Sequence, residues 1–82
     1  MTTVHERGVR FYVYPQDHGP PHVHGVYGQS EIIILLFAAG RVGLGDPKRM
    51  SRRAKHNEVK HILNAAAACY DRLAAAWEAM HG

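Results

Sequence analysis

The sequence predicts an α+β domain, in which an antiparallel meander of three or four strands carries one long C-terminal helix across one face. Three observations lead to this prediction. Residues 8–15 alternate between apolar and polar side chains, as a strand with one buried face does. Residues 31–37 form a second strand-like segment that is rich in isoleucine and leucine. From residue 59 to residue 80, apolar side chains recur at steps of three and four, the spacing of an amphipathic helix.

The strands follow one another with short connections. The expected strands cover residues 8–15, 22–28, 31–37 and, as a short edge strand, 41–44, all within a single domain over residues 1–82. Residues 1–7 are polar and predict a loose lead-in. Pro15, Pro20 and Pro21 cannot continue a ladder because each lacks a backbone donor, so they predict a constrained connection.

The helix predicted over residues 51–80 begins after Ser51, a residue type favoured at the N-cap. At 1.5 Å per residue it would be roughly 45 Å long, which exceeds the diameter of a domain of this size. We therefore expect it either to bend, near residues 61–65, or to project its basic first turns beyond the sheet.

The strand over residues 31–37 carries apolar side chains on both faces, which is typical of a strand covered on both sides. One small domain has little chain with which to cover two faces. We expect the second face to meet another chain, either in a homodimer or with a cognate protein partner. The alternative is that flanking loops cover it.

Composition narrows the function classes. Ten Lys and Arg against seven Asp and Glu give a net charge of +3, and the single Cys69 offers no disulfide. The longest apolar run, over residues 32–39, is too short to cross a bilayer as a helix, so no membrane role is expected. The first residues lack the apolar run of a signal peptide, which predicts a cytoplasmic protein.

Three of the seven histidines lie within residues 18–24: His18, His22 and His24, with Asp17 beside them. Because alternate strand residues share a face, His22 and His24 should point the same way. The three imidazoles could bind zinc, nickel or iron, with Asp17 as a ligand or as an orienting group. They could equally form a general acid/base pair that acts on a phosphodiester, or only fix the turn by hydrogen bonding and packing.

A second candidate site is basic. Seven of the ten Lys and Arg lie within residues 41–60: Arg41, Lys48, Arg49, Arg52, Arg53, Lys55 and Lys60. Cations at a helix N-terminus oppose the macrodipole, so helix stability does not explain Arg52, Arg53 and Lys55, whereas a bound phosphate would. The alternatives are a solvated helix face and a docking face for an acidic protein. Tyr12 and Tyr14 share one face of the first predicted strand, where they could stack on bases or simply cover the sheet.

The segment from Gly8 to Tyr14 leads into Asp-His-Gly-Pro-Pro-His-Val-His at residues 17–24, and with these residues the chain resembles the bacterial family called domain of unknown function 4160. The resemblance extends over essentially the whole chain and includes the late Trp77. It implies the toxin-side or partner component of a small two-gene module, as in toxin-antitoxin pairs. The chain departs from the family in its more apolar third strand and in a longer link over residues 45–53.

Together these features predict a small toxin-antitoxin-type protein that acts on or binds RNA through the histidines and the basic helix start. In that interpretation His22 and His24 are the acid/base or ligand pair, His18 is the third member and Asp17 orients them. Arg52, Arg53, Lys55, Lys48 and Arg49 would hold a phosphate or an antitoxin-like partner. The rival interpretations are a metal-binding protein without catalysis and an interaction module whose histidines only shape a turn.

Overall fold

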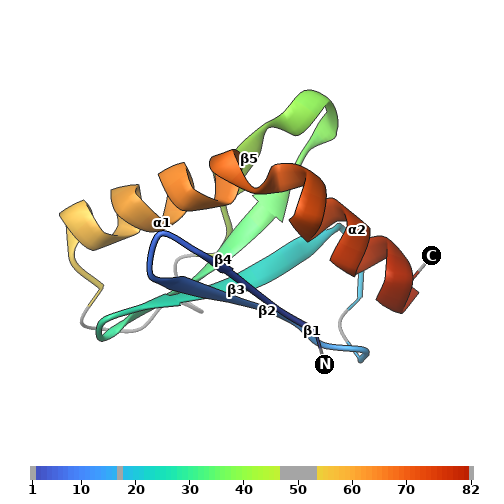
Figure 1. The fold of residues 1–82 in the computed structure, drawn as a ribbon, viewed down its shortest axis with the longest axis horizontal. Coiled ribbons are helices and arrows are strands. Elements are labelled where there is room, and N and C mark those ends of the chain that lie inside the picture. Colours follow the sequence, from blue (N-terminus) through green and yellow to red (C-terminus); the bar gives the residue numbers. More distant parts are fainter. Residues whose placement is uncertain (1, 17, 47–53, 82) are drawn as a thin grey trace.

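The computed structural model describes residues 2–16, 18–46 and 54–81, which form one antiparallel sheet followed by two helices (Figure 1). The strands are β1 (Thr2–Glu6), β2 (Val9–Val13), β3 (His22–Tyr27), β4 (Ser30–Leu36) and β5 (Val42–Leu44), and the helices are α1 (His56–Ala68) and α2 (Tyr70–His81). A short 3₁₀ turn at Ala38–Gly40 joins the last two strands. The α+β class is confirmed, and the sheet has five strands in chain order rather than three or four.

The prediction of a loose lead-in was wrong, because β1 pairs along its whole length with β2. The two-residue turn between them consists of Arg7 and Gly8, whose φ angles are 51° and 79°. Positive φ at both central residues is the geometry of a type I′ turn, which matches the twist of a hairpin. The signal in the sequence was a run of β-branched residues, Thr2 to Val4, placed before a turn that contains glycine.

The C-terminal part forms two helices where one was predicted over residues 51–80. Between them Cys69 leaves helical geometry, with φ −116° and ψ 25°, and its N–H bonds to the carbonyls of Ala65 and Ala66. The expected bend is therefore present, but it lies at Cys69 rather than near residues 61–65. The molecule measures 33 × 23 × 21 Å, so a straight helix of about 45 Å would have left the sheet.

α1 also begins later than predicted. Lys55 occupies its N-cap position without a side-chain hydrogen bond, and Ser51, the predicted N-cap, lies outside the described residues. The start of the helix is held instead by the buried Ser30. Its hydroxyl donates to Oε1 of Glu58 at 2.8 Å and accepts the N–H of Lys55 at 3.3 Å. The first residue of β4 thus anchors the first turn of α1.

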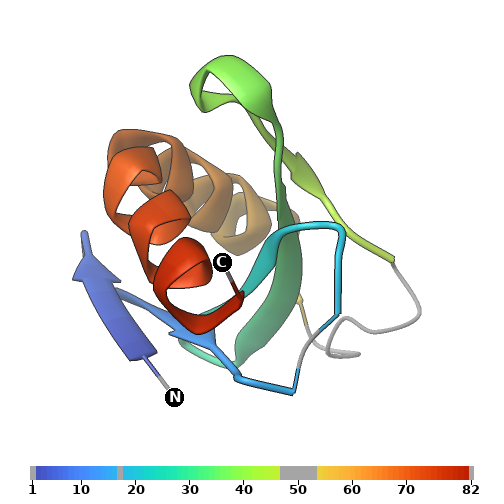
Figure 2. The ribbon, with the colours of Figure 1, turned by 90° about the vertical axis from the view of Figure 1, so that its right-hand side faces the viewer.

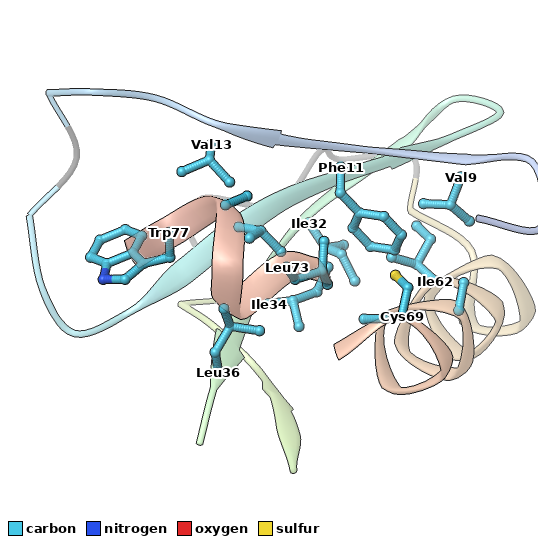
Figure 3. Close-up of a cluster of buried hydrophobic side chains, with 14 residues drawn as sticks. Val9, Phe11, Val13, Ile32, Ile34, Leu36, Ile62, Cys69, Leu73 and Trp77 are labelled. Atoms are coloured by element: carbon cyan, nitrogen blue, oxygen red, sulfur yellow. The ribbon is translucent and has the colours of Figure 1, made fainter. Parts of the chain in front are cut away.

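The hydrophobic core lies between one face of the sheet and both helices (Figure 3). Its members are the alternate strand residues and the inward helix residues: Val9, Phe11, Val13, Val23, Ile32, Ile34, Leu36, Ile62, Ala65, Ala66, Cys69, Leu73, Ala76 and Trp77. Gly25 stands between Phe11 and Ile32 in the sheet register. A Cβ on Gly25 would lie 2.7 Å from Cγ2 of Ile62, so the missing side chain is what lets α1 approach β3.

Both helices lie on the same side of the sheet, and the sheet curves around them (Figure 2). On the opposite, helix-free face, Ile33 of β4 is nevertheless only 5% exposed. The N–H of Gly45 bonds to the carbonyl of Ile33 at 2.7 Å, and a Cβ on Gly45 would lie 2.7 Å from Cγ2 of Ile33. At this position the chain covers its own second face, as the loop alternative expected. Leu35, further along, is half-buried, and a homodimer or partner on this face stays a prediction.

Candidate functional site

Three rings predicted as site residues lie together on the helix-free face. The register pairs Tyr12 of β2 with His24 of β3, and Tyr14 follows directly after β2. The rings of Tyr12 and Tyr14 are stacked with centroids 6.3 Å apart and planes inclined by 19°. The rings of Tyr14 and His24 meet edge to face, with centroids 4.9 Å apart and planes inclined by 74°. All three side chains are half-buried, so part of each ring is accessible.

These rings continue into α2. The ring of His22 lies 5.5 Å from that of His24 and 5.3 Å from that of Trp77. Trp77 in turn stacks on His81 at 3.7 Å with an interplanar angle of 19°, and Nδ1–H of His81 donates to the carbonyl of Trp77 at 3.2 Å. We call this continuous set the aromatic row: Tyr12, Tyr14, His24, His22, Trp77 and His81.

Within the aromatic row, His22 is held inside the protein. It is 7% exposed, and its Nδ1–H donates to the carbonyl of Pro20 at 2.9 Å. Less than 1 Å² of Nε2 is accessible to solvent. Either ring nitrogen could reach a substrate or a metal only after the imidazole left this position. The geometry therefore favours the structural interpretation of His22, which ties the proline-containing connection to Trp77.

The structure brings His22 and His24 together, as predicted, but does not group His18 with them. His18 is exposed, and Asp17 lies outside the described residues. In residues 2–16, 18–46 and 54–81 no three His, Cys, Asp or Glu side chains are arranged to hold a metal ion. A metal on this motif stays a prediction.

Most of the predicted basic clamp lies outside the part of the chain that the structure describes: Lys48, Arg49, Arg52 and Arg53. Lys55 is described, exposed at the N-cap of α1. The first turn of that helix also contains Glu58, whose carboxylate is bonded to Ser30. The phosphate or partner clamp therefore stays a prediction as well.

Comparison with protein families matches residues 8–78 to the family described as "Domain of unknown function (DUF4160)". The chain belongs to the DUF4160 family. The matched range begins at the turn before β2 and includes every member of the aromatic row except His81. Searches among curated proteins and among solved structures gave no match.

His81 and Trp77 of this DUF4160 chain were not among the site residues predicted from the sequence. The available signal was their spacing: residues four apart on a helix lie on the same face, one turn from each other. The contact of Trp77 with His22 had no comparable signal, because the two residues are far apart in the sequence and on different elements.

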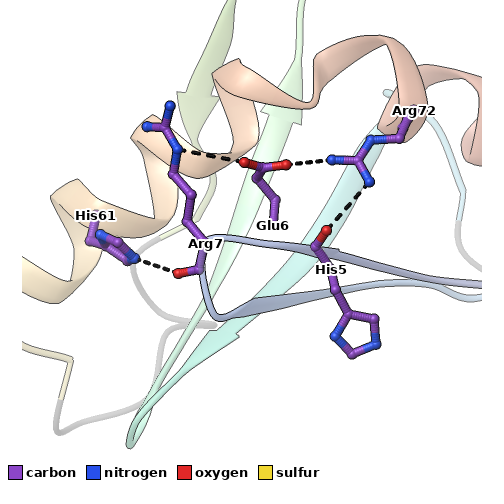
Figure 4. Close-up of polar contacts among 5 residues, drawn as sticks. All are labelled: His5, Glu6, Arg7, His61 and Arg72. Atoms are coloured by element: carbon purple, nitrogen blue, oxygen red, sulfur yellow. Dashed lines mark hydrogen bonds and ion pairs between the residues drawn. The ribbon is translucent and has the colours of Figure 1, made fainter.

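Polar contacts fix the β1–β2 hairpin of the DUF4160 chain onto both helices (Figure 4). Nη2 of Arg72 lies 2.5 Å from Oε1 of Glu6, and Nη1 of Arg72 donates to the carbonyl of His5 at 3.4 Å. Nε of Arg7 lies 3.5 Å from Oε2 of Glu6, and Nε2–H of His61 donates to the carbonyl of Arg7 at 2.9 Å. These residues were not among the predicted site residues.

Cys69 is 4% exposed and packs in the hydrophobic core as a small side chain. Burial raises the pKa of its thiol, and the nearby charge of Arg72 opposes this only in part. The thiol is therefore neutral at physiological pH and is no candidate nucleophile of this DUF4160 chain. In the described residues, no helix is long and apolar enough to cross a membrane.

Proposed function

We propose that this DUF4160 chain is the toxin-side binding component of a toxin-antitoxin-type module, and that it binds single-stranded RNA on the helix-free face of its sheet. The observation that carries the proposal is the adjacent placement of Tyr12, Tyr14 and His24 on that face. Half-exposed rings on a sheet stack on unpaired bases, and each stacked base contributes about 1–3 kcal/mol.

A positive charge on the same face favours one position for the phosphates. Arg10 lies two residues before Tyr12 on β2, and the register places it opposite His5 of β1 and Val26 of β3. Arg10 is exposed and carries a fixed positive charge. A phosphate backbone is attracted to Arg10, so we expect the strand of RNA to cross β1, β2 and β3 at this position.

We further propose that the chain binds RNA without cleaving it. The acid/base mechanism predicted from the sequence uses two imidazoles, and the nitrogens of both must reach the reacting atoms. His24 is half-exposed, but Nε2 of His22 has less than 1 Å² of accessible surface and its Nδ1 is bonded to Pro20. Toxicity would then follow from sequestering RNA.

The binding test uses a labelled single-stranded RNA of about ten nucleotides, read by fluorescence anisotropy. Tyr12→Ala and Tyr14→Ala should each weaken binding by roughly 5–150-fold, the equivalent of one lost stacking contact. Tyr12→Phe and Tyr14→Phe are the matched controls, because they keep the ring and remove only the hydroxyl, and they should bind like the wild type. Equal affinity of the alanine and phenylalanine variants would refute base stacking, as would equal binding of a duplex of the same length.

The toxin-side assignment has its own test. Expression of the chain in its native host should arrest growth, and co-expression of the neighbouring gene should relieve the arrest. Normal growth of the expressing host would remove this part of the proposal and leave the RNA binding to be judged separately.

A second candidate function is a protein-interaction module that uses the same face. It is favoured by the half-buried apolar side chains of Val26 and Leu35, which lie beside the rings in the register. Sedimentation of the pure protein over a range of concentrations separates the two. A dimer that dissociates in Val26→Lys, without RNA binding by the wild type, would favour the interaction module.

A further inference from the structure

The outer edge of β5 ends the sheet and carries backbone groups that point away from β4. The hydrogen bonds that flank β5 run from Phe37 N–H to Arg41 O and from Gly45 N–H to Ile33 O. Hydrogen-bonded pairs alternate along an antiparallel ladder, so between these two bonds Gly43 is the residue that bonds to β4. Val42 and Leu44 therefore direct their N–H and C=O groups outward, in the pattern that accepts another strand.

An apolar hollow lies beside this edge on the helix side of the sheet. It has a volume of about 440 Å³ and is lined by Leu44, Val59 and Leu63, with His56 and Lys60. Leu44 is 41% exposed. A strand added next to β5 would run about 4.8 Å away and would point every second side chain to the helix side. Apolar side chains at those alternate positions would enter the hollow.

The charge at the hollow selects between possible occupants. Lys60 and His56 are exposed, and none of the described residues that line the hollow is a carboxylate. Pairing with the β5 of a second copy would bring another Lys60 to the same place, with like charges on both sides. An acidic segment would instead complement the charge of Lys60.

The opposite edge of the sheet is less open. Glu6 and Val9 flank the two-residue turn and form a hydrogen-bonded pair, so the backbone groups of His5 point outward from β1. The carbonyl of His5 accepts a hydrogen bond from Arg72, whose guanidinium also pairs with Glu6 (Figure 4). A side chain from α2 thus occupies the β1 edge, whereas the edge at β5 has an adjoining hollow.

We propose that β5 binds an extended, acidic segment of a partner protein as a sixth strand, with apolar side chains at alternate positions of that segment filling the hollow formed by Leu44, Val59 and Leu63. This inference concerns a different surface from the RNA proposal and does not depend on it. Main-chain hydrogen bonds to Val42 and Leu44 supply affinity, and the hollow and Lys60 supply selectivity.

The probe is a synthetic seven-residue peptide with valine at alternate positions and glutamate between them, titrated into the full chain and followed by amide NMR. The amide protons of Val42 and Leu44 should exchange rapidly in the free protein and become protected on binding, while Gly43 is protected throughout. The same peptide with N-methyl groups on its pairing edge is the matched control and should not bind, because its main chain cannot add to a sheet.

Charge selectivity is tested by reversal. Lys60→Glu should weaken binding of the glutamate peptide by about fivefold at low salt and should improve binding of a lysine version of the peptide. Lys60 is exposed, so the variant Lys60→Glu should fold. Any of three results would overturn the proposal. These are binding that leaves the Val42 and Leu44 amides unprotected, equal binding of the glutamate and lysine peptides, and no binding at millimolar peptide. Concentration-dependent protection of these amides without peptide would also overturn it, in favour of a second copy.

Discussion

α1 packs tightly against β3 at Gly25, and the substitution Gly25→Ala tests whether this contact sets the distance between helix and sheet. A Cβ at Gly25 would lie 2.7 Å from Cδ1 of Ile34, 2.7 Å from Cγ2 of Ile62 and 3.2 Å from Cε1 of Phe11. Cδ1 of Ile34 ends a flexible side chain and can rotate away. Cγ2 of Ile62 is bonded directly to the Cβ of that residue, which lies on α1. Relieving this clash therefore moves the helix.

The magnitude follows from two opposing effects. Inserting a methyl group into a packed core costs about 1–3 kcal/mol. Replacing a glycine within a strand recovers roughly 0.5–1 kcal/mol of backbone entropy. We therefore expect Gly25→Ala to reduce the free energy of unfolding by about 0.5–2 kcal/mol. For a domain of this size each kcal/mol lowers Tm by about 4–8 °C.

The assay is urea denaturation followed by the fluorescence of Trp77, the single tryptophan. Gly19→Ala is the matched control, because a Cβ at Gly19 would meet nothing within 4 Å. Ile62→Ala alone should cost about 2–5 kcal/mol, and the double variant should cost less than the sum because the new methyl group enters vacated space. The tight contact would be refuted if the variant Gly25→Ala were as stable as Gly19→Ala. It would also be refuted if the stability costs of Gly25→Ala and Ile62→Ala were strictly additive in the double variant.

Two further predictions concern buried polar and titratable groups. His22→Ala should lower the free energy of unfolding by about 1–3 kcal/mol and change the emission of Trp77, because it removes a buried ring and the hydrogen bond to Pro20. The structural role of His22 would be contradicted if His22→Ala kept the stability of the wild type and lost a stoichiometric metal that the tag-free wild type retains. That result would identify a metal site. Because burial raises the thiol pKa of Cys69 above its ordinary value of 9.0, the folded state disfavours the thiolate: stability should hold below about pH 9 and fall as the pH rises further. Native Cys69 should react slowly with a chromogenic disulfide at pH 8 and rapidly in urea; rapid reaction of the native protein would show that the thiol is accessible.

Local patterns predicted the elements whose evidence is local. Alternation identified β2 and β3 and assigned Tyr12 and His24 to their faces, and the steps of three and four identified the helical region. β1 was missed because its residues look polar when read alone. Its apolar contact is a single Val4 that packs against the core, and its pairing depends on the type I′ turn.

The break in the helix and the organisation of the site depend on contacts between distant residues. No helix-breaking residue marks Cys69, and both flanking segments are good helix formers. With the break at Cys69, α1 and α2 both lie on the curved sheet (Figure 2). In the same way, the neighbours of His22 on either side, Pro20 and Trp77, come from segments that a single-sequence pattern cannot place together.

His22 and His24 of the histidine motif therefore have different roles, and the sequence does not reveal this difference. His22 and His24 share a strand and a spacing of two, which made them look like an equivalent pair. Because His22 lies at the first residue of β3, its ring reaches Trp77 and is enclosed, whereas His24 lies opposite Tyr12 and keeps part of its ring accessible. Enclosure of His22 fixes the end of β3 against α2, and that fixed end holds His24 edge-on to Tyr14. If the accessible rings bind a ligand, the contribution of His22 is to position them, and His22→Ala should weaken that binding through stability while His24→Ala weakens it in a chain that is fully folded.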